Sequence, residues 1–132
     1  MTSLNDNPAG AAQPPGLRRS VAFIHENADG DIGLAEIAAA ANLTPRAVQY
    51  MFRRHLGMTP MEYLRRVRLD RAHRDLQAAN PAVDTVNSIA GRWGFAHAGR
   101  FSVAYRQVFG NPPSVTLRMT RPRPETRAVS GA

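Results

Sequence analysis

Arginine and glutamine side chains recur at helical spacing in residues 44–57, TPRAVQYMFRRHLG. The guanidinium of Arg46 can donate two hydrogen bonds to O6 and N7 of guanine, and the amide of Gln49 can pair similarly with adenine. Each such pair discriminates against a wrong base by about 1–3 kcal/mol. The segment therefore predicts a base-reading helix face, with a plain solvated face as the alternative. The outward positions near the start of this helix are Pro45, Arg46, Gln49, Tyr50 and Arg53.

A second segment, HAGRFSVAYRQVFG at residues 97–110, has a similar layout but fewer side chains that can recognise bases. Only Arg100 can read guanine well, while Val103 offers methyl groups to a thymine methyl. Gly99 also weakens the helix by about 1 kcal/mol relative to alanine. Most of the sequence choice is therefore expected in the first segment. The matching outward positions of the second are Ala98, Gly99, Arg100 and Val103.

Contacts to the DNA backbone are expected beside the base contacts. Arg106 and the backbone amides around it are predicted to bind phosphate, and Arg53 occupies the same place in the first segment. His97 stands at a helix start, where its side chain is placed to cap the helix or contact phosphate. The predicted backbone contacts are Pro45, Arg53, His97, Gly99 and Arg106.

The composition fits a binding protein better than an enzyme. All 17 basic residues are arginine and the net charge is +7, which suits phosphate and base edges. The chain has no cysteine, so disulfides, thiolate metal sites and cysteine nucleophiles are excluded. The four histidines show no ligand pairing with carboxylates, and no acid–base constellation is visible. We therefore expect no catalysis, no metal and no cofactor.

The elements that would position these residues are all helical. Apolar residues fall at helical spacing, Thr44-Pro45 and Thr59-Pro60 are helix starts, and Gly57 and Gly110 are stops. No segment shows convincing alternation of period two. Trp93 is expected in the core, and the arginines at 65, 66, 68, 71 and 74 on a solvated face. The predicted helices are 17–28, 34–41, 45–55, 60–79, 86–93 and 97–108, with a final turn at 112–118.

The two segments belong to a duplication. Ile37-Ala38 and Ile89-Ala90 are 52 residues apart, whereas Phe52-Arg53 and Tyr105-Arg106 are 53 apart, so one residue is inserted in the intervening turn. Each copy reads as a short helix, a tight turn and a longer helix, which is the helix-turn-helix layout. Asn42 and its counterpart in the second turn, a glycine, suit the positive φ of a tight turn.

The predicted organisation is one double helix-turn-helix domain. Its first unit covers 17–58, a linker helix 59–80 and its second unit 84–118, and the linker would be about 30 Å long. Major-groove faces of B-DNA recur about every 34 Å, so two hairpins on such a rod could read adjacent grooves without dimerising. The flanking segments, a Pro- and Gly-rich leader and a basic tail, are predicted to be disordered: 1–16 and 119–132.

Residues 89–118 carry the pattern IA-x3-GF-x5-F-x3-YR-x3-G-x2-P-x4-R, which closely resembles the signature of the AraC/XylS family of bacterial transcription regulators. The hairpin LAEIAAAANLTPRAVQYMFRRHLG resembles the family's first helix-turn-helix. The resemblance implies a seven-helix, homeodomain-like module that binds promoters and often touches RNA polymerase. By alignment with the family, the base-reading positions of the first helix are Arg46, Gln49 and Tyr50.

The resemblance also implies a context for the chain. Family members usually carry a separate effector-binding or dimerisation domain before this module, so the chain is either a short stand-alone member or an excised domain. The linker-like residues 1–16 slightly favour excision. We expect it to be monomeric by itself and cytoplasmic, associated with the nucleoid through double-stranded DNA, with no membrane partner. The alternatives are a non-specific architectural DNA-binding module and a module whose arginines bind an acidic protein.

Overall fold

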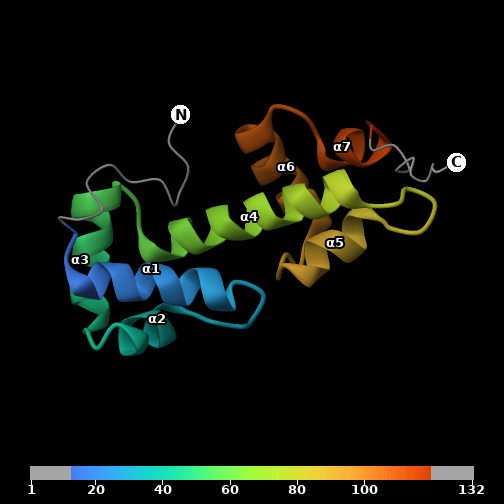
Figure 1. Ribbon diagram of the computed structural model, residues 1–132. Coiled ribbons are helices and arrows are strands. Elements are labelled where there is room, and N and C mark those ends of the chain that lie inside the picture. Colours follow the sequence, from blue (N-terminus) through green and yellow to red (C-terminus); the bar gives the residue numbers. More distant parts are fainter. Residues whose placement is uncertain (1–12, 120–132) are drawn as a thin grey trace, which may run out of the picture. The chain divides into compact units, whose positions relative to one another are not determined.

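The computed structural model describes residues 13–119, which contain seven helices and no strand (Figure 1). The all-helical prediction is confirmed. Most of the predicted leader and nearly all of the predicted tail lie outside the described residues. No helix within 13–119 is long and apolar enough to cross a membrane. The helices are α1 Pro15–Asn27, α2 Leu34–Ala40, α3 Pro45–Leu56, α4 Pro60–Ala78, α5 Val86–Arg92, α6 Ala98–Phe109 and α7 Pro113–Met119.

The chain divides into two compact units, and the boundary falls inside α4, between Arg68 and Leu69. The first half of α4 therefore belongs to unit 1, with α1, α2 and α3. The second half belongs to unit 2, with α5, α6 and α7. The helix that the sequence suggests as a linker is thus part of both units, because it supplies the last helix of one and the first helix of the other.

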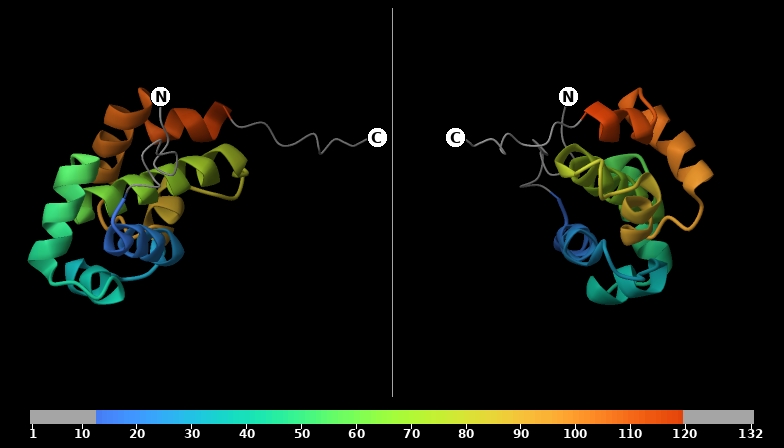
Figure 2. Two further views of the ribbon diagram at one scale, coloured as in Figure 1. Left: turned by 60° about the vertical axis from the view of Figure 1, so that its left-hand side comes forward. Right: turned by 90° about the vertical axis from the view of Figure 1, so that its right-hand side faces the viewer.

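Unit 1 has α1, α2 and α3 packed pairwise, with α3 standing steeply across the other two (Figures 1 and 2). Local chemistry sets the ends of α3. The Thr44 side chain accepts a hydrogen bond from the Ala47 amide, and Gly57 ends the helix in the left-handed region at φ 72°. Val48 and Phe52 are buried, so the opposite face of α3 points to solvent.

The helix α1 begins at Pro15, two residues before the predicted start at 17. Proline suits the first helical turn because its φ is already helical and it lacks an amide that would need a partner. Gly16 is buried in the first turn, where an added Cβ would lie 2.9 Å from a side-chain carbon of Leu43. A larger residue at position 16 would require the end of the Leu43 side chain to move, and this close approach of α1 to the turn between α2 and α3 is not visible in the local sequence.

Two contacts from α4 complete unit 1. Tyr63 is buried, packs edge-on against Phe52 and shares a 2.8 Å hydrogen bond with Nε2 of His25. Arg68 donates to the carbonyl oxygens of Ala28 at 2.8 Å and Gly30 at 2.6 Å, beyond the end of α1. The prediction of a solvated role for this arginine is wrong, because its guanidinium satisfies carbonyls that the helix end leaves unpaired.

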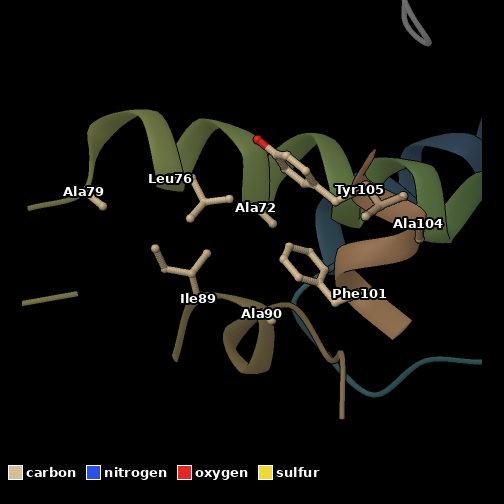
Figure 3. Packing of buried hydrophobic residues seen from close by; sticks show 9 residues of the cluster. Ala72, Leu76, Ala79, Ile89, Ala90, Phe101, Ala104 and Tyr105 are labelled. Carbon is tan, nitrogen blue, oxygen red and sulfur yellow. The ribbon is translucent and has the colours of Figure 1, made fainter. Parts of the chain in front are cut away.

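Unit 2 is built around the second half of α4, whose apolar face meets Ile89 of α5 and Phe101 and Tyr105 of α6 (Figure 3). Its α6 ends at Gly110, which is left-handed with φ 87°, as Gly57 is in unit 1. Trp93 is half-buried at the edge of this cluster, and its indole donates to Asp75 at 2.8 Å. Its predicted place in the core is therefore confirmed in part. The cluster consists of Leu69, Ala72, Leu76, Ala79, Ile89, Ala90, Phe101, Ala104 and Tyr105.

The duplication extends to the whole of both units. Buried Leu17 and Ile24 of α1 lie 52 residues before buried Leu69 and Leu76 of α4. Each copy also offsets one size change with another. Val48 is replaced by the larger Phe101, while Met51 is replaced by the smaller Ala104, so that the volume of the core changes less than either substitution alone would suggest. Two four-helix copies thus share α4.

A hydrogen-bonded chain ties three helices of unit 2 together. Tyr105 of α6 lies 2.6 Å from Nδ1 of His73 in α4 and 2.7 Å from the hydroxyl of Thr116 in α7. The His73 ring also stacks on Phe109, with ring centroids 4.1 Å apart. Burial lowers the pKa of His73, an effect that Asp70 opposes and Arg74 reinforces. Burial likewise raises the pKa of Tyr105, and the hydrogen bond with Thr116 opposes this increase.

Acidification is expected to destabilise unit 2 through His73. Because its pKa is lower in the folded protein, the unfolded chain binds more protons once the pH falls below about 6.5. The stabilising contribution is complete above that pH and is lost as the pH falls toward the folded-state pKa. Thermal unfolding followed by Trp93 fluorescence should show a midpoint that decreases between about pH 7.5 and 5.5.

The matched variants for this experiment are His73→Asn and His97→Asn. Asparagine at 73 keeps an acceptor for Tyr105 but cannot titrate, so the slope of the midpoint against pH should flatten. His97→Asn is the control for replacing an exposed histidine of the same unit that lies outside this hydrogen-bonded chain. A slope that persists in His73→Asn would assign the pH dependence to another group.

Candidate nucleic-acid interface

The outward face of α3 gathers the side chains expected to read bases. Arg46, Gln49 and Tyr50 are all exposed, and they follow one another at helical spacing opposite buried Val48 and Phe52. Tyr50 keeps 64% of its surface exposed, an unusual fraction for an aromatic side chain. Pro45 and Arg53 are exposed as well, so the sequence predicted the exposure of the whole set correctly.

One open surface hollow runs along this same face of α3. It adds Arg54 to the predicted set, as a further cation beside Arg53. Its lining offers charged, amide and aromatic groups to one ligand, which suits a surface that meets both phosphates and base edges. The residues of α3 that line it are Arg46, Gln49, Tyr50, Arg53 and Arg54.

The outward face of α6 is exposed but carries few polar side chains. Gly99, Arg100, Val103 and Arg106 all reach solvent, whereas Ala98 is half-buried. His97 occupies the N-cap position, but its side chain makes no capping hydrogen bond, so the capping role is wrong. Its exposed imidazole therefore remains available to a ligand.

The two recognition helices can be aligned through their caps. Thr44 and His97 are both N-cap residues, and Gly57 and Gly110 both end their helices in the left-handed region. Equivalent residues of α3 and α6 therefore differ by 53 in residue number along the whole helix. The turns before them keep an offset of 52. Leu43 donates to the carbonyl of Ala38 and Phe95 to that of Ala90, at 2.9 and 3.0 Å. The inserted residue of the second copy is therefore Ala96, immediately before the N-cap.

This alignment pairs the two faces residue by residue. Arg100 corresponds to half-buried Ala47, not to Arg46, so the two arginines leave their helices at different angles. The counterpart of Arg46 is Gly99. Gln49 corresponds to Ser102, a half-buried residue of α6 that was not among the outward positions expected from the sequence. Val103 and Arg106 keep their correspondence with Tyr50 and Arg53.

The electrostatics of both faces favour an anionic partner. Neither α3 nor α6 contains an acidic residue. Within residues 13–119, the guanidinium groups of Arg46, Arg53, Arg100 and Arg106 are exposed and have no hydrogen-bond or ion-pair partner, unlike Arg92, which pairs with Asp75 at 2.8 Å. Unpaired exposed arginines on otherwise neutral or apolar helix faces suit phosphate and base edges.

Two helix-turn-helix units whose second helices expose unpaired arginines define a DNA-binding domain. Residues 37–119 match the family described as a helix-turn-helix domain. The chain belongs to the AraC/XylS family of transcription regulators. Both the family and the fold expected from its signature are therefore confirmed.

The relatives agree with this assignment. The chain is 39% identical over 107 residues to a probable thc operon regulatory protein of Rhodococcus erythropolis, and the match covers 81% of this chain. This chain spans only 32% of that regulator's length. A probable AraC family transcriptional regulator from Rhodopseudomonas palustris has a TM-score of 0.76 at 34% identity, covering 83% of this chain and 100% of that one.

A further solved structure shares the fold. It is the DNA-binding domain of AdpA, a global transcriptional factor, solved in complex with a target DNA. Its TM-score is 0.69 at 23% identity, and the match covers 87% of this chain and 97% of that one. At this identity the likeness extends to the fold alone.

Proposed function

We propose that the chain regulates transcription by binding double-stranded DNA sequence-specifically, with α3 and α6 as its two recognition helices. The observation that carries the proposal is the α3 face, where exposed Arg46, Gln49 and Tyr50 lie together at the start of a helix that follows a tight turn. Binding, not catalysis, is the activity we assign, and its place is the cytoplasm, at the nucleoid.

Within this function the residues divide by chemistry. Arg46, Gln49 and Tyr50 of α3, with Arg100 and Val103 of α6, contact base edges in the major groove. Most of the discrimination comes from α3, because the α6 counterparts of Arg46 and Gln49 are Gly99 and the half-buried Ser102. The backbone contacts come from Pro45, Arg53, His97, Gly99 and Arg106.

The two units read two neighbouring major-groove segments of one duplex. The presence of two complete helix-turn-helix copies in one chain supports this reading. In this proposal the chain binds DNA as a monomer, and RNA polymerase is a second partner. Selection from random duplexes at a fixed salt concentration should yield a bipartite site with elements about 10 bp apart.

Two substitutions separate base reading from phosphate binding. Arg46→Ala should weaken binding to the selected site by about tenfold and relax the preference at one guanine, because a bidentate pair is lost. Arg106→Ala should weaken binding to selected and scrambled duplexes alike and reduce the salt slope by about one. Fluorescence anisotropy with both duplexes, at several salt concentrations, measures these effects.

The ranking of the two helices is tested by Arg100→Ala on the same duplexes. Arg100→Ala should relax the base preference at a single position of the DNA site. The base preference in the element that α3 binds should stay intact. If Arg100→Ala abolished selectivity while Arg46→Ala preserved it, the assignment of α3 as the main reader would be wrong. A protein with a steep salt dependence and no preferred sequence would be an architectural DNA-binding module instead.

A further inference from the structure

Val103 is an exposed apolar side chain that folding does not explain. It keeps 60% of its surface exposed in the middle of α6, so its methyl groups contribute little to the core. Valine is also a poorer helix former than alanine, because its branched Cβ loses rotamer freedom in a helix. Val103 corresponds to Tyr50 of α3, which is 64% exposed. Both recognition helices thus expose their large apolar group at the same position.

The side chains around Val103 leave it prominent. Gly99 lies one turn before it, and a Cβ added there would meet no atom within 4 Å. Packing therefore does not require glycine at 99, nor does a left-handed backbone, since this glycine is not among those with positive φ. The empty position lets the helix approach a groove closely, and Arg100 stands beside it as an exposed cation.

The chemistry of this patch matches one base. In the major groove thymine presents a C5-methyl group, an apolar feature that no other base carries, while guanine offers two acceptors to an arginine. We propose that Val103 selects a thymine in the DNA element bound by α6, by packing its γ methyl groups against the thymine C5-methyl. This inference rests on the proposed function. It names thymine as one base that α6 recognises.

The contact can be tested one methyl group at a time. Each thymine of the selected duplex is replaced singly by deoxyuridine, which removes the C5-methyl and keeps the Watson–Crick pairing. One replacement should weaken binding about fourfold, because burying a methyl-sized group contributes about 0.8 kcal/mol. The measurement is the Kd from fluorescence anisotropy at one salt concentration.

The protein variant that completes the experiment is Val103→Ala. It should bind the thymine duplex about fourfold more weakly and become insensitive to the same deoxyuridine replacement. Alanine is the better helix former at this exposed position, so the thermal midpoint should not fall. The matched control is Tyr50→Ala, which weakens the α3 contacts and should retain the deoxyuridine sensitivity of the α6 element.

The outcomes separate this inference from the function on which it rests. A selected bipartite site at which every deoxyuridine replacement is silent would overturn the thymine contact and leave the proposed function standing. A replacement that weakens Val103→Ala as much as the wild type would also overturn it, by assigning the methyl to another side chain. A protein that selects no sequence would overturn both.

Discussion

Phe101→Ala should unfold unit 2. The ring of Phe101 is fully buried, and its centroid lies 4.9 Å from that of Phe95 and 5.6 Å from that of Tyr105. Removing a buried phenylalanine ring costs about 3–5 kcal/mol. Small domains have total stabilities of about 5–15 kcal/mol, and a unit of this size stands at the lower end. The loss therefore approaches the whole stability of unit 2.

The single tryptophan makes this loss measurable. Trp93 packs at the edge of the unit 2 cluster, so urea unfolding followed by its fluorescence reports on that unit. Val103→Ala is the matched control, because it truncates an exposed residue of the same helix. Phe101→Leu should lie between the two, since it keeps most of the volume. A Phe101→Ala protein with a wild-type midpoint would contradict the packing in Figure 3.

The functional consequence follows from the division into units. With α6 unfolded, Phe101→Ala should select only the element that α3 reads, and the second half of the bipartite site should disappear from the selection. Amide exchange of the α3 backbone would show whether unit 1 stays folded. Protection there together with loss of the second element would show that each unit reads its own part of the site.

The helix boundaries were predictable because their causes are local. A threonine followed by proline at 44–45 fixes the start of α3, and the glycines at 57 and 110 provide the left-handed ends. These signals act within a few residues of one another, so one sequence is enough to read them. The exposure of Arg46 follows in the same way, because buried Val48 and Phe52 fix the opposite face.

The register between the two copies was less predictable. Sequence offsets of 52 and 53 place one extra residue somewhere in the second turn, but only the turn hydrogen bonds show that it is Ala96. The extra residue precedes the N-cap, so its exact position does not alter the register within α6. There the offset of 53 between Phe52 and Tyr105 already pairs Arg46 with Gly99.

Long-range polar contacts were not predictable at all. The bonds from Tyr63 to His25 and from Tyr105 to His73 join residues more than thirty positions apart. Each residue alone has an ordinary reading as a core aromatic or a surface histidine. Their partners are set by how the helices pack, and packing is a property of the assembled unit.

Arg68 is the clearest such case, and its removal should destabilise unit 1. The guanidinium donates to the carbonyls of Ala28 and Gly30. Burial lowers the pKa of Arg68, and Asp31 opposes this, but an arginine remains charged at neutral pH. Hydrogen bonds from a charged donor contribute about 1.5–3 kcal/mol each, and the Gly30 carbonyl can return to water. Arg68→Ala should therefore cost about 2–3 kcal/mol.

Arg65→Ala is the matched control, since it removes the same charge from an exposed position of the same helix. It should change stability by less than about 0.5 kcal/mol. Arg68→Lys should recover only part of the loss, because one ammonium cannot reproduce a planar fork that spans two carbonyls. Hydrogen exchange of the α1 and α3 backbone amides measures the stability of unit 1 in all three variants. Equal effects of Arg68→Ala and Arg65→Ala would show that the end of α1 does not depend on this arginine, and that a solvated face was the correct reading.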